Sequence, residues 1–249
     1  MKEKAGNMNL VIDYGNTTIK TAVFSDEKMV DRFTIEKNDS YHIFDIFTSY
    51  PAIMHVLLSA VSDYPPSLVE KLKNSGLDFM ILDHTTALPV KNQYSTKESL
   101  GFDRVANVVA AHTIFPGNNV LVIDAGTAIT YDLITSNAEY IGGNISPGIK
   151  MRAKALHAFT RKLPMIEVNG EQPLIGNSTA EAIAAGIVNG VVYETQGYID
   201  QLKKDYKDLK VILTGGDHNH FDKKLKNSIF VDSNLNLIGL NRILNYNAT

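Results

Sequence analysis

Two short stretches of the chain combine a carboxylate, a glycine and hydroxyl side chains at similar spacing. VIDYGNTTIK spans Val11–Lys20 and VIDAGTAITY spans Val122–Tyr131, so Asp124 follows Asp13 by 111 positions. In each stretch an apolar, strand-like run ends in Asp-x-Gly. Glycine lets the backbone approach a ligand closely, turn amides bind phosphate oxygens, and a carboxylate can hold hydrated magnesium. The pattern predicts two phosphate-binding hairpins, which would hold a polyphosphate from both sides if they faced each other.

The residues around each turn add polar groups that suit phosphate. Asn16–Thr18 follow the first glycine and Thr127 follows the second, while Lys20 on the returning strand can reach a phosphate as a point charge. The alternative is that both stretches are ordinary core hairpins, and their recurrence at matching places argues against it. LTGGD, Leu213–Asp217, ends a later strand and is interpreted as a further wall of the nucleotide site. An ordinary turn after a strand has the same pattern.

Composition narrows the class of protein. The 249 residues are 44% hydrophobic and 20% charged, which is typical of a globular chain. A net charge of −3 gives no basic footprint for nucleic acid or a membrane surface. The chain has no cysteine, no apolar signal-peptide stretch behind its charged N-terminus, and no apolar run long enough to cross a membrane. We expect a cytoplasmic protein with neither nucleic acid nor membrane as a partner.

The order of predicted elements occurs twice. Three strands (9–13, 18–24 and 28–35) precede a helix (39–49), a strand (52–59), a helix after Pro65-Pro66, a strand (79–82) and a helix from about Phe102. Strands at 120–124, 128–134 and 139–145 repeat the beginning, and helices and strands alternate afterwards. Duplication explains the repeat, and FPGNN (Phe115–Asn119) has the composition of a boundary. The sequence predicts two mixed-sheet α/β domains, residues 9–117 and 118–249.

Six motifs follow one another along the chain: DYGNTTIK, GFDR, DAGTAITYD, GGNISPG, GNSTAEAI and LTGGD. In this order, from about Asn9 to the last helix, the chain resembles type III pantothenate kinase. That family belongs to the actin–hexokinase–Hsp70 superfamily, whose actin-like ATPase architecture has two duplicated ribonuclease H-like domains. The resemblance implies ATP-dependent phosphorylation of pantothenate to 4′-phosphopantothenate, the first step of coenzyme A biosynthesis. It also implies a homodimer that needs magnesium and a monovalent cation, potassium or ammonium.

The resemblance assigns roles to residues. Asp103 would be the catalytic base and Asp124 the ligand of the monovalent cation. Thr127 would contact ATP, as would the first motif, which consists of Asp13, Tyr14, Gly15, Asn16, Thr17, Thr18, Ile19 and Lys20. The pantothenate site would contain Tyr94, Gly101, Phe102, Asp103, Arg104 and Thr179, the last supplied by the neighbouring subunit. The loop Asn92–Leu100 departs from the family pattern after Tyr94, where Thr96-Lys97 replaces an expected proline.

Physical reasons support these roles, but each residue also has a simpler structural explanation. A kinase that acts on a primary hydroxyl needs a carboxylate to accept its proton, and Arg104 offers a planar fork for a substrate carboxylate. Asp103 could instead be a helix cap or first-turn acid, and Arg104 a solvated surface residue. Ser178 and Glu181 form a capping-box pattern that would explain their presence near Thr179 without any substrate. His218 and His220 resemble a metal pair, but a solvated loop explains them better because no third ligand has a fixed spacing.

Two other functions stay open at this level. The same fold could serve a nucleotide-dependent switch, although a switch has no need of a carboxylate beside an arginine fork in GFDR. Another small-molecule kinase or phosphohydrolase of the superfamily would share the nucleotide motifs. A substrate screen with ATP separates it from pantothenate kinase.

Overall fold

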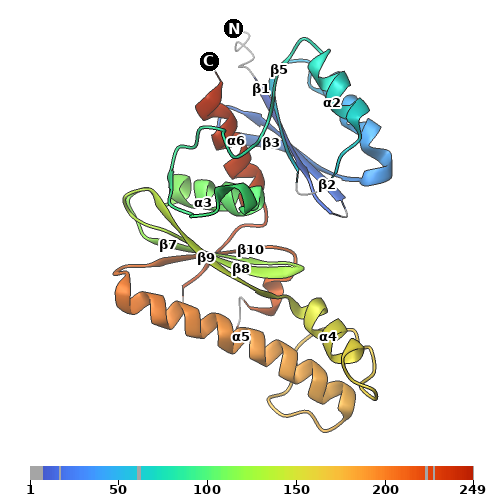
Figure 1. Cartoon of the computed structure of the whole chain (residues 1–249), viewed down its shortest axis with the longest axis vertical. Coiled ribbons are helices and arrows are strands. Elements are labelled where there is room, and N and C mark those ends of the chain that lie inside the picture. The colour runs from blue at the N-terminus through green and yellow to red at the C-terminus, as the bar shows by residue number, and fades with distance from the viewer. Residues whose placement is uncertain (1–7, 17, 61–62, 222–223, 227, 249) are drawn as a thin grey trace. The chain divides into compact units, whose positions relative to one another are not determined.

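The computed structural model of the chain describes residues 8–16, 18–60, 63–221, 224–226 and 228–248. Two compact units are present (Figure 1): unit 1 comprises Met1–Ile114 and Asn234–Thr249, and unit 2 comprises Phe115–Ser233. The C-terminal segment therefore groups with the N-terminal unit, whereas the sequence predicts a C-terminal domain of 118–249. The reason is local to unit 1: the last helix, α6 (Leu235–Asn247), packs against helix α3 (Phe102–Ile114) and strand β1 (Met8–Tyr14).

Unit 1 is built on a five-stranded mixed sheet in the order β3-β2-β1-β4-β5. Strands β2 (Thr18–Ser25) and β3 (Lys28–Glu36) continue antiparallel from β1, and β4 (Ile53–Ala60) and β5 (Asp78–Ile81) add parallel strands on the other side. Central β1 is buried along most of its length, as its continuous apolar run predicts, and edge strand β3 alternates exposed and half-buried residues. A 3-10 segment, η1 (Lys37–His42), and helix α1 (Ile43–Ser49) together occupy the predicted helix 39–49.

Helices cover both faces of this sheet. Leu10, Ile12 and Tyr14 share a core with residues of α1 and of α2 (Pro66–Lys73). The alternate residues of β1 face α6, because the Asn9 side-chain amide donates to Asn241 Oδ1 at 2.8 Å. A Cβ on Gly239 of α6 would lie 1.8 Å from the carbonyl oxygen of Ala106 in α3, so glycine permits the close packing of these two helices. The described loop before α3 contains only the short strand β6 (Lys91–Asn92) and the turn η2 (Lys97–Ser99).

Unit 2 repeats the plan. Its strands follow the order β11-β10-β7-β8-β9, with bounds β7 (Val120–Ala125), β8 (Ala128–Ile134), β9 (Glu139–Pro147), β10 (Lys210–Thr214) and β11 (Phe230–Val231). Strands β7, β8 and β9 are antiparallel neighbours, and β10 and β11 run parallel to β7. Leu121, Ile123 and Ala125 of β7 point into a core shared with α4 (Ile149–Ala158) and the long α5 (Thr179–Asp205). A turn, η3 (His218–His220), follows β10.

The same strand order in both units confirms the predicted α/β fold of two duplicated mixed sheets. Three meander strands are followed in each unit by parallel strands, the order that the repeated sequence pattern predicts. Each repeat begins with a hairpin whose first strand ends in Asp-x-Gly, so the duplicated motif occupies the same place in both sheets.

Candidate functional site

The first hairpin joins β1 to β2 through a tight turn at Gly15. The Gly15 N–H donates to the carbonyl of Thr18 at 3.1 Å, and a Cβ on Gly15 would lie 2.9 Å from that oxygen. Asn16 is exposed at the tip, whereas Thr17, another residue of the predicted phosphate motif, lies outside the described residues. Tyr14 and Ile19 have side chains in the core of unit 1, so these two predicted ATP-binding residues can offer a ligand only backbone groups.

Asp13 lies one residue before the end of β1, with polar neighbours on both adjacent strands. In the strand register Lys20 of β2 is opposite Asp13, and Ser59 of β4 is beside it on the other side. Register partners point to the same face of a sheet, and odd-numbered β1 residues face the α3–α6 side. The predicted phosphate-binding carboxylate and the helix that carries Asp103 therefore lie on the same side of the sheet of unit 1.

The second hairpin joins β7 to β8 and is held from two directions. The Gly126 N–H donates to the carbonyl of Ala128 at 3.0 Å and closes the turn. Gly148, the N-cap of α4, donates to the carbonyl of Thr127 at 3.0 Å, and a Cβ on Gly148 would lie 2.2 Å from the Gly126 carbonyl oxygen. Thr127 itself stays exposed at the tip. The GGNISPG motif thus ends in a glycine that must be small because it packs on this turn.

Asp124, the predicted cation ligand, lies among oxygen-bearing side chains. In register, Thr130 of β8 and Thr214 of β10 flank it on the same sheet face. Gly215 of LTGGD adopts φ +91°, and a Cβ there would lie 2.5 Å from Asp124 Oδ1. Glycine at 215 is required both by its left-handed backbone and by the closeness of this carboxylate. His218 Nδ1 is paired with the Gly215 carbonyl oxygen at 2.7 Å, so that imidazole holds the turn.

The GFDR segment forms the start of α3. Asp103 is the second residue of the helix, and its Oδ1 accepts the Arg104 N–H at 2.9 Å, so Asp103 is a first-turn acid and not the N-cap. A Cβ on Gly101 would lie 2.4 Å from Asp103 Oδ1, so glycine at 101 leaves room for the carboxylate. Phe102, between them, is half-buried.

Two predicted substrate-binding residues meet at this point. Arg104 is only 5% exposed, and its guanidinium lies over the Tyr94 ring, 5.4 Å from the ring centroid. The alternative of a solvated surface arginine is therefore wrong. The Tyr94 N–H donates to Asn92 Oδ1 at 2.9 Å, which fixes the loop that presents the ring. Stacking on an aromatic face orients a guanidinium fork for a planar anion.

Thr179 is the first residue of α5 and is exposed. Ser178 is the N-cap: its Oγ accepts the Glu181 N–H at 3.2 Å, while Glu181 Oε2 accepts the Asn177 N–H at 2.6 Å. The predicted capping pattern is present, with the return hydrogen bond made one residue before the cap. Because Ser178 and Glu181 do the capping, the Thr179 side chain is not needed for it.

A polar network next to the second hairpin was not predicted from the sequence. Arg152 of α4 donates through Nε to the Pro147 carbonyl at 2.7 Å and through a terminal nitrogen to Ser146 Oγ at 2.8 Å. The same guanidinium pairs with Glu194 of α5 at 2.5 Å, and Glu194 accepts the Tyr131 O–H at 3.2 Å. Arg152 thereby holds the segment that ends in Gly148. Its signal in the sequence is an arginine one helical turn after Gly148.

The surroundings of Glu194 and Tyr131 shift their pKa values and so determine which of them is charged. Burial alone would raise the pKa of Glu194, but hydrogen bonds from Ser146 and Arg152 outweigh it, so the pKa is lowered and the carboxylate stays ionised. Burial and the Glu194 charge raise the pKa of Tyr131, which stays neutral and donates. The ion pair between Arg152 and Glu194 is consequently maintained at neutral pH.

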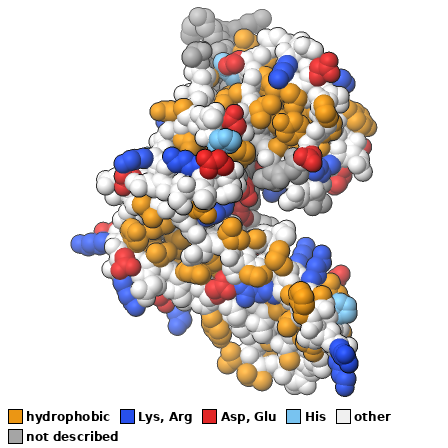
Figure 2. Space-filling model, viewed as in Figure 1, with side chains coloured by type: hydrophobic (Ala, Val, Ile, Leu, Met, Phe, Trp, Pro, Cys, Tyr) orange, Lys and Arg blue, Asp and Glu red, His pale blue; other side chains and the backbone are white. Residues whose placement is uncertain are grey.

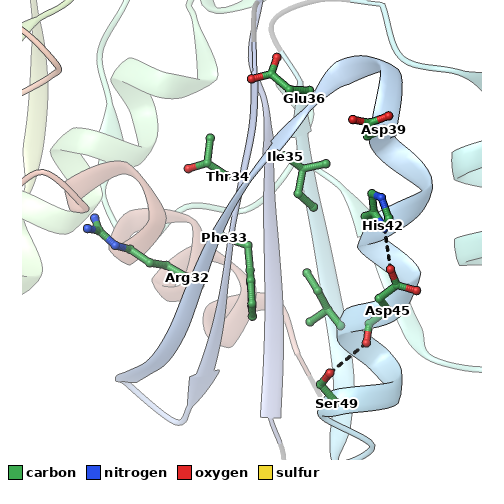
Figure 3. Close-up of a pocket in the computed structure, with 10 residues that line it drawn as sticks. Arg32, Phe33, Thr34, Ile35, Glu36, Asp39, His42, Asp45 and Ser49 are labelled. Carbon is green, nitrogen blue, oxygen red and sulfur yellow. Dashed lines mark hydrogen bonds and ion pairs between the residues drawn. The ribbon is translucent and has the colours of Figure 1, made fainter.

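A groove of about 650 Å³ lies elsewhere in unit 1, along edge strand β3. Figure 3 shows Phe33 and Ile35 of β3 on one side and the hydrogen-bonded pair His42 and Asp45 on the other. None of the predicted site residues is among those that line it. The residues that the motifs predict therefore lie elsewhere than this groove, near the ends of β1 and β7 and at the start of α3.

Comparisons with known proteins show the family to which the chain belongs. The type III pantothenate kinase family matches residues 9–201. A type III pantothenate kinase of Bacteroides fragilis (strain YCH46) is 47% identical over 240 residues, 96% of this chain and 98% of that protein. The same-named protein of Christiangramia forsetii is 46% identical, with 97% and 100% covered. That of Porphyromonas gingivalis is 36% identical, again with 97% and 100% covered.

Solved structures show the fold. A protein of Campylobacter jejuni described as a Baf family transcriptional activator aligns with a TM-score of 0.60 at 26% identity, covering 96% of this chain and 98% of that one. A glucokinase from an Antarctic psychrotroph aligns with a TM-score of 0.55 at 13% identity, covering 96% and 99%. The latter likeness concerns the fold alone. Among the described residues, no helix is long and apolar enough to cross a membrane.

Proposed function

The chain belongs to the type III pantothenate kinase family and phosphorylates pantothenate with ATP in coenzyme A biosynthesis, and we propose that GFDR and the two Asp-x-Gly hairpins carry this reaction. The observation that carries the proposal is the arrangement at the start of α3. There Gly101 makes room for the Asp103 carboxylate, and the next residue stacks its guanidinium on Tyr94.

Asp103 acts as the general base. It accepts the proton of the pantothenate primary hydroxyl as that oxygen attacks the γ-phosphate of ATP, and ADP leaves. Arg104, oriented by Tyr94, binds the carboxylate end of the substrate through its planar fork. A base and an anion-binding group on consecutive residues would hold the two ends of one small molecule in a fixed relation, which reduces the entropy cost of reaction.

The first hairpin binds the phosphates of ATP through its turn amides, Asn16 and Lys20, and Asp13 holds magnesium. The donor fits, because Mg²⁺ is usually held by one or two carboxylates together with substrate phosphates, and Asp13 offers one carboxylate near the end of β1. When bound, the metal neutralises charge on the phosphates. Asp13, at its strand end beside Lys20, supplies the fixed carboxylate.

The second hairpin binds ATP through Thr127 and the monovalent cation through Asp124. Asp124 is flanked by the hydroxyl residues Thr130 and Thr214, a set of oxygen donors that suits a hard cation such as potassium. Arg152 and Gly148 keep the turn at Thr127 in place. Ammonium would be accepted by the same oxygens.

The active form is a homodimer that associates through α5. The outer side of this helix carries small residues at helical spacing, Gly186, Gly190 and Gly197, and apart from the neighbouring backbone of the helix itself no atom of the described residues lies within 4 Å of a Cβ built on any of them. Tyr193, between them, is 61% exposed. Figure 2 shows further hydrophobic surface over the α4 and α5 region. Between these two helices, the large exposed hydrophobic side chains include Phe159, Met165, Leu174 and Ile175. Monomers rarely expose such a patch.

We further propose that Thr179, the exposed first residue of the same helix, reaches the substrate site of the partner subunit. The remaining part of the proposal is a cytoplasmic location with pantothenate and ATP as ligands and no nucleic acid, supported by the net charge of −3 and the metabolic role of the family.

A subunit-mixing experiment tests the shared site. Asp103→Asn and Thr179→Ala proteins should each have little activity, and a mixture that has exchanged subunits should regain part of it, because one hybrid site is intact. Exchange is verified by mass spectrometry of differently tagged chains. Absence of recovery after complete exchange would mean that each site is built from one chain.

A further inference from the structure

Ser59, one residue before the end of β4, has no role in the reaction described above. It is the register partner of Asp13, so the two side chains occupy the same face of the sheet on adjacent strands. Adjacent strands lie about 4.8 Å apart, within reach of a serine hydroxyl and a carboxylate. Ser59 is 0% exposed, so the hydroxyl is directed into the protein beside the predicted phosphate site and not into solvent.

The Ser59 hydroxyl has no hydrogen-bond partner among the described residues. A buried hydroxyl without a partner is costly, and native proteins retain few of them unless the group has a role. The plainest use for this one is the carboxylate next to it. A carboxylate oxygen is an acceptor, and a hydrogen bond to an ionised acceptor is roughly twice as strong as one between neutral groups.

The duplicated fold repeats the arrangement. In unit 2, Thr214, the last residue of β10, is the register partner of Asp124, as Ser59, one residue before the end of β4, is of Asp13. β10 follows β7 in the second sheet as β4 follows β1 in the first. A hydroxyl residue thus stands beside the strand-end aspartate in both halves, which a chance serine at 59 would not explain.

We propose that Ser59 is a positioning residue of the nucleotide site: its hydroxyl donates a hydrogen bond to the Asp13 carboxylate when that carboxylate binds the magnesium of MgATP. The bond would fix one carboxylate oxygen and leave the other available to the cation. This inference rests on the proposed role of Asp13. It adds a residue of β4 to a site that the sequence motifs confine to the β1–β2 hairpin.

The test compares Ser59→Ala with Thr21→Val in the full-length protein. Thr21 is also 0% exposed with a hydroxyl lacking a partner among the described residues, but it pairs with Ile12, on the face that points to α1 and α2. Both substitutions remove an unpartnered hydroxyl with little change of shape, so neither should lower the melting temperature. Only Ser59→Ala should weaken MgATP binding, by about tenfold, and raise the magnesium concentration needed for half-maximal binding.

Ser59→Thr keeps a hydroxyl and should bind MgATP with the affinity of the wild type, since threonine occupies the equivalent place in unit 2. Binding is measured by calorimetry with MgATP alone, so the result does not depend on pantothenate. If Ser59→Ala binds MgATP as the wild type does, or if Thr21→Val loses as much affinity, the positioning role is wrong. Failure of the wild type to phosphorylate pantothenate would instead overturn the proposed function and leave the binding comparison intact.

Discussion

Replacing Asp103 by asparagine separates a catalytic carboxylate from a structural one. Asparagine keeps a side-chain oxygen that can accept the Arg104 N–H, now bonded to Asp103 Oδ1 at 2.9 Å. The structural cost is the loss of one negative charge in the first turn of α3, about 0.3–1 kcal/mol. For a chain of this size such a loss lowers the melting temperature by roughly 1–4 °C.

The catalytic cost is much larger if Asp103 is the base. General-base help is worth about a hundredfold or more, or about 2.7 kcal/mol of transition-state stabilisation. We therefore expect Asp103→Asn to fold, to bind MgATP with unchanged affinity, and to phosphorylate pantothenate at least about a hundred times more slowly. A coupled assay of ADP release, with calorimetry for ATP and a thermal melt, measures all three quantities.

Asp45→Asn provides the matched control. Asp45 is also an acid in the first turn of a helix, α1, and its side chain is 74% exposed, paired with His42. The control should show a similarly small change in melting temperature and wild-type turnover. Wild-type turnover by a well-folded Asp103→Asn protein would refute the assignment of the base, and with it the interpretation of GFDR as the reacting centre.

Two further predictions concern a cation and a proton. If Asp124 holds the monovalent cation, activity should be weak in sodium or Tris buffers, and potassium or ammonium should restore it in the wild type but not in Asp124→Asn; equal rates in every buffer would remove that role. Burial, and secondarily the charge of Arg242, lower the pKa of His112 below its usual 6.5, so the fold favours neutral His112. The stability that neutral His112 contributes is complete above pH 6.5 and is lost as the pH falls toward the lowered pKa. Between pH 7.5 and pH 5.5, the free energy of urea unfolding should therefore decrease less in His112→Gln than in the wild type. Equal losses would exclude His112 as the group responsible.

Local patterns were sufficient to predict most of the fold. Continuous apolar runs gave β1 and β7, and the Asp-x-Gly turns gave both hairpins, because these features depend on neighbouring residues. The association of α6 with unit 1 was not predictable, since it depends on Gly239 meeting Ala106 across more than half the chain.

The residues of the candidate site likewise divide into those that a local motif predicts and those that depend on contacts made in the fold. Asp13, Asp103, Arg104 and Asp124 could be proposed from the sequence because they lie in motifs. Ser59 was missed because its closeness to Asp13 exists only in the pairing of β4 with β1. Arg152 and Glu194 were missed because they meet between two helices that are 20 residues apart at their nearest ends, where a sequence pattern has no fixed spacing.

Transfer of phosphate from ATP to pantothenate by the purified protein is the most direct test of the central claim. With MgATP and potassium present, mass spectrometry should detect phosphorylated pantothenate formed in step with ADP, and the same incubation with Asp103→Asn should form at least about a hundred times less. ATP turnover without phosphorylated pantothenate, or transfer to a different small alcohol in preference to pantothenate, would contradict the account.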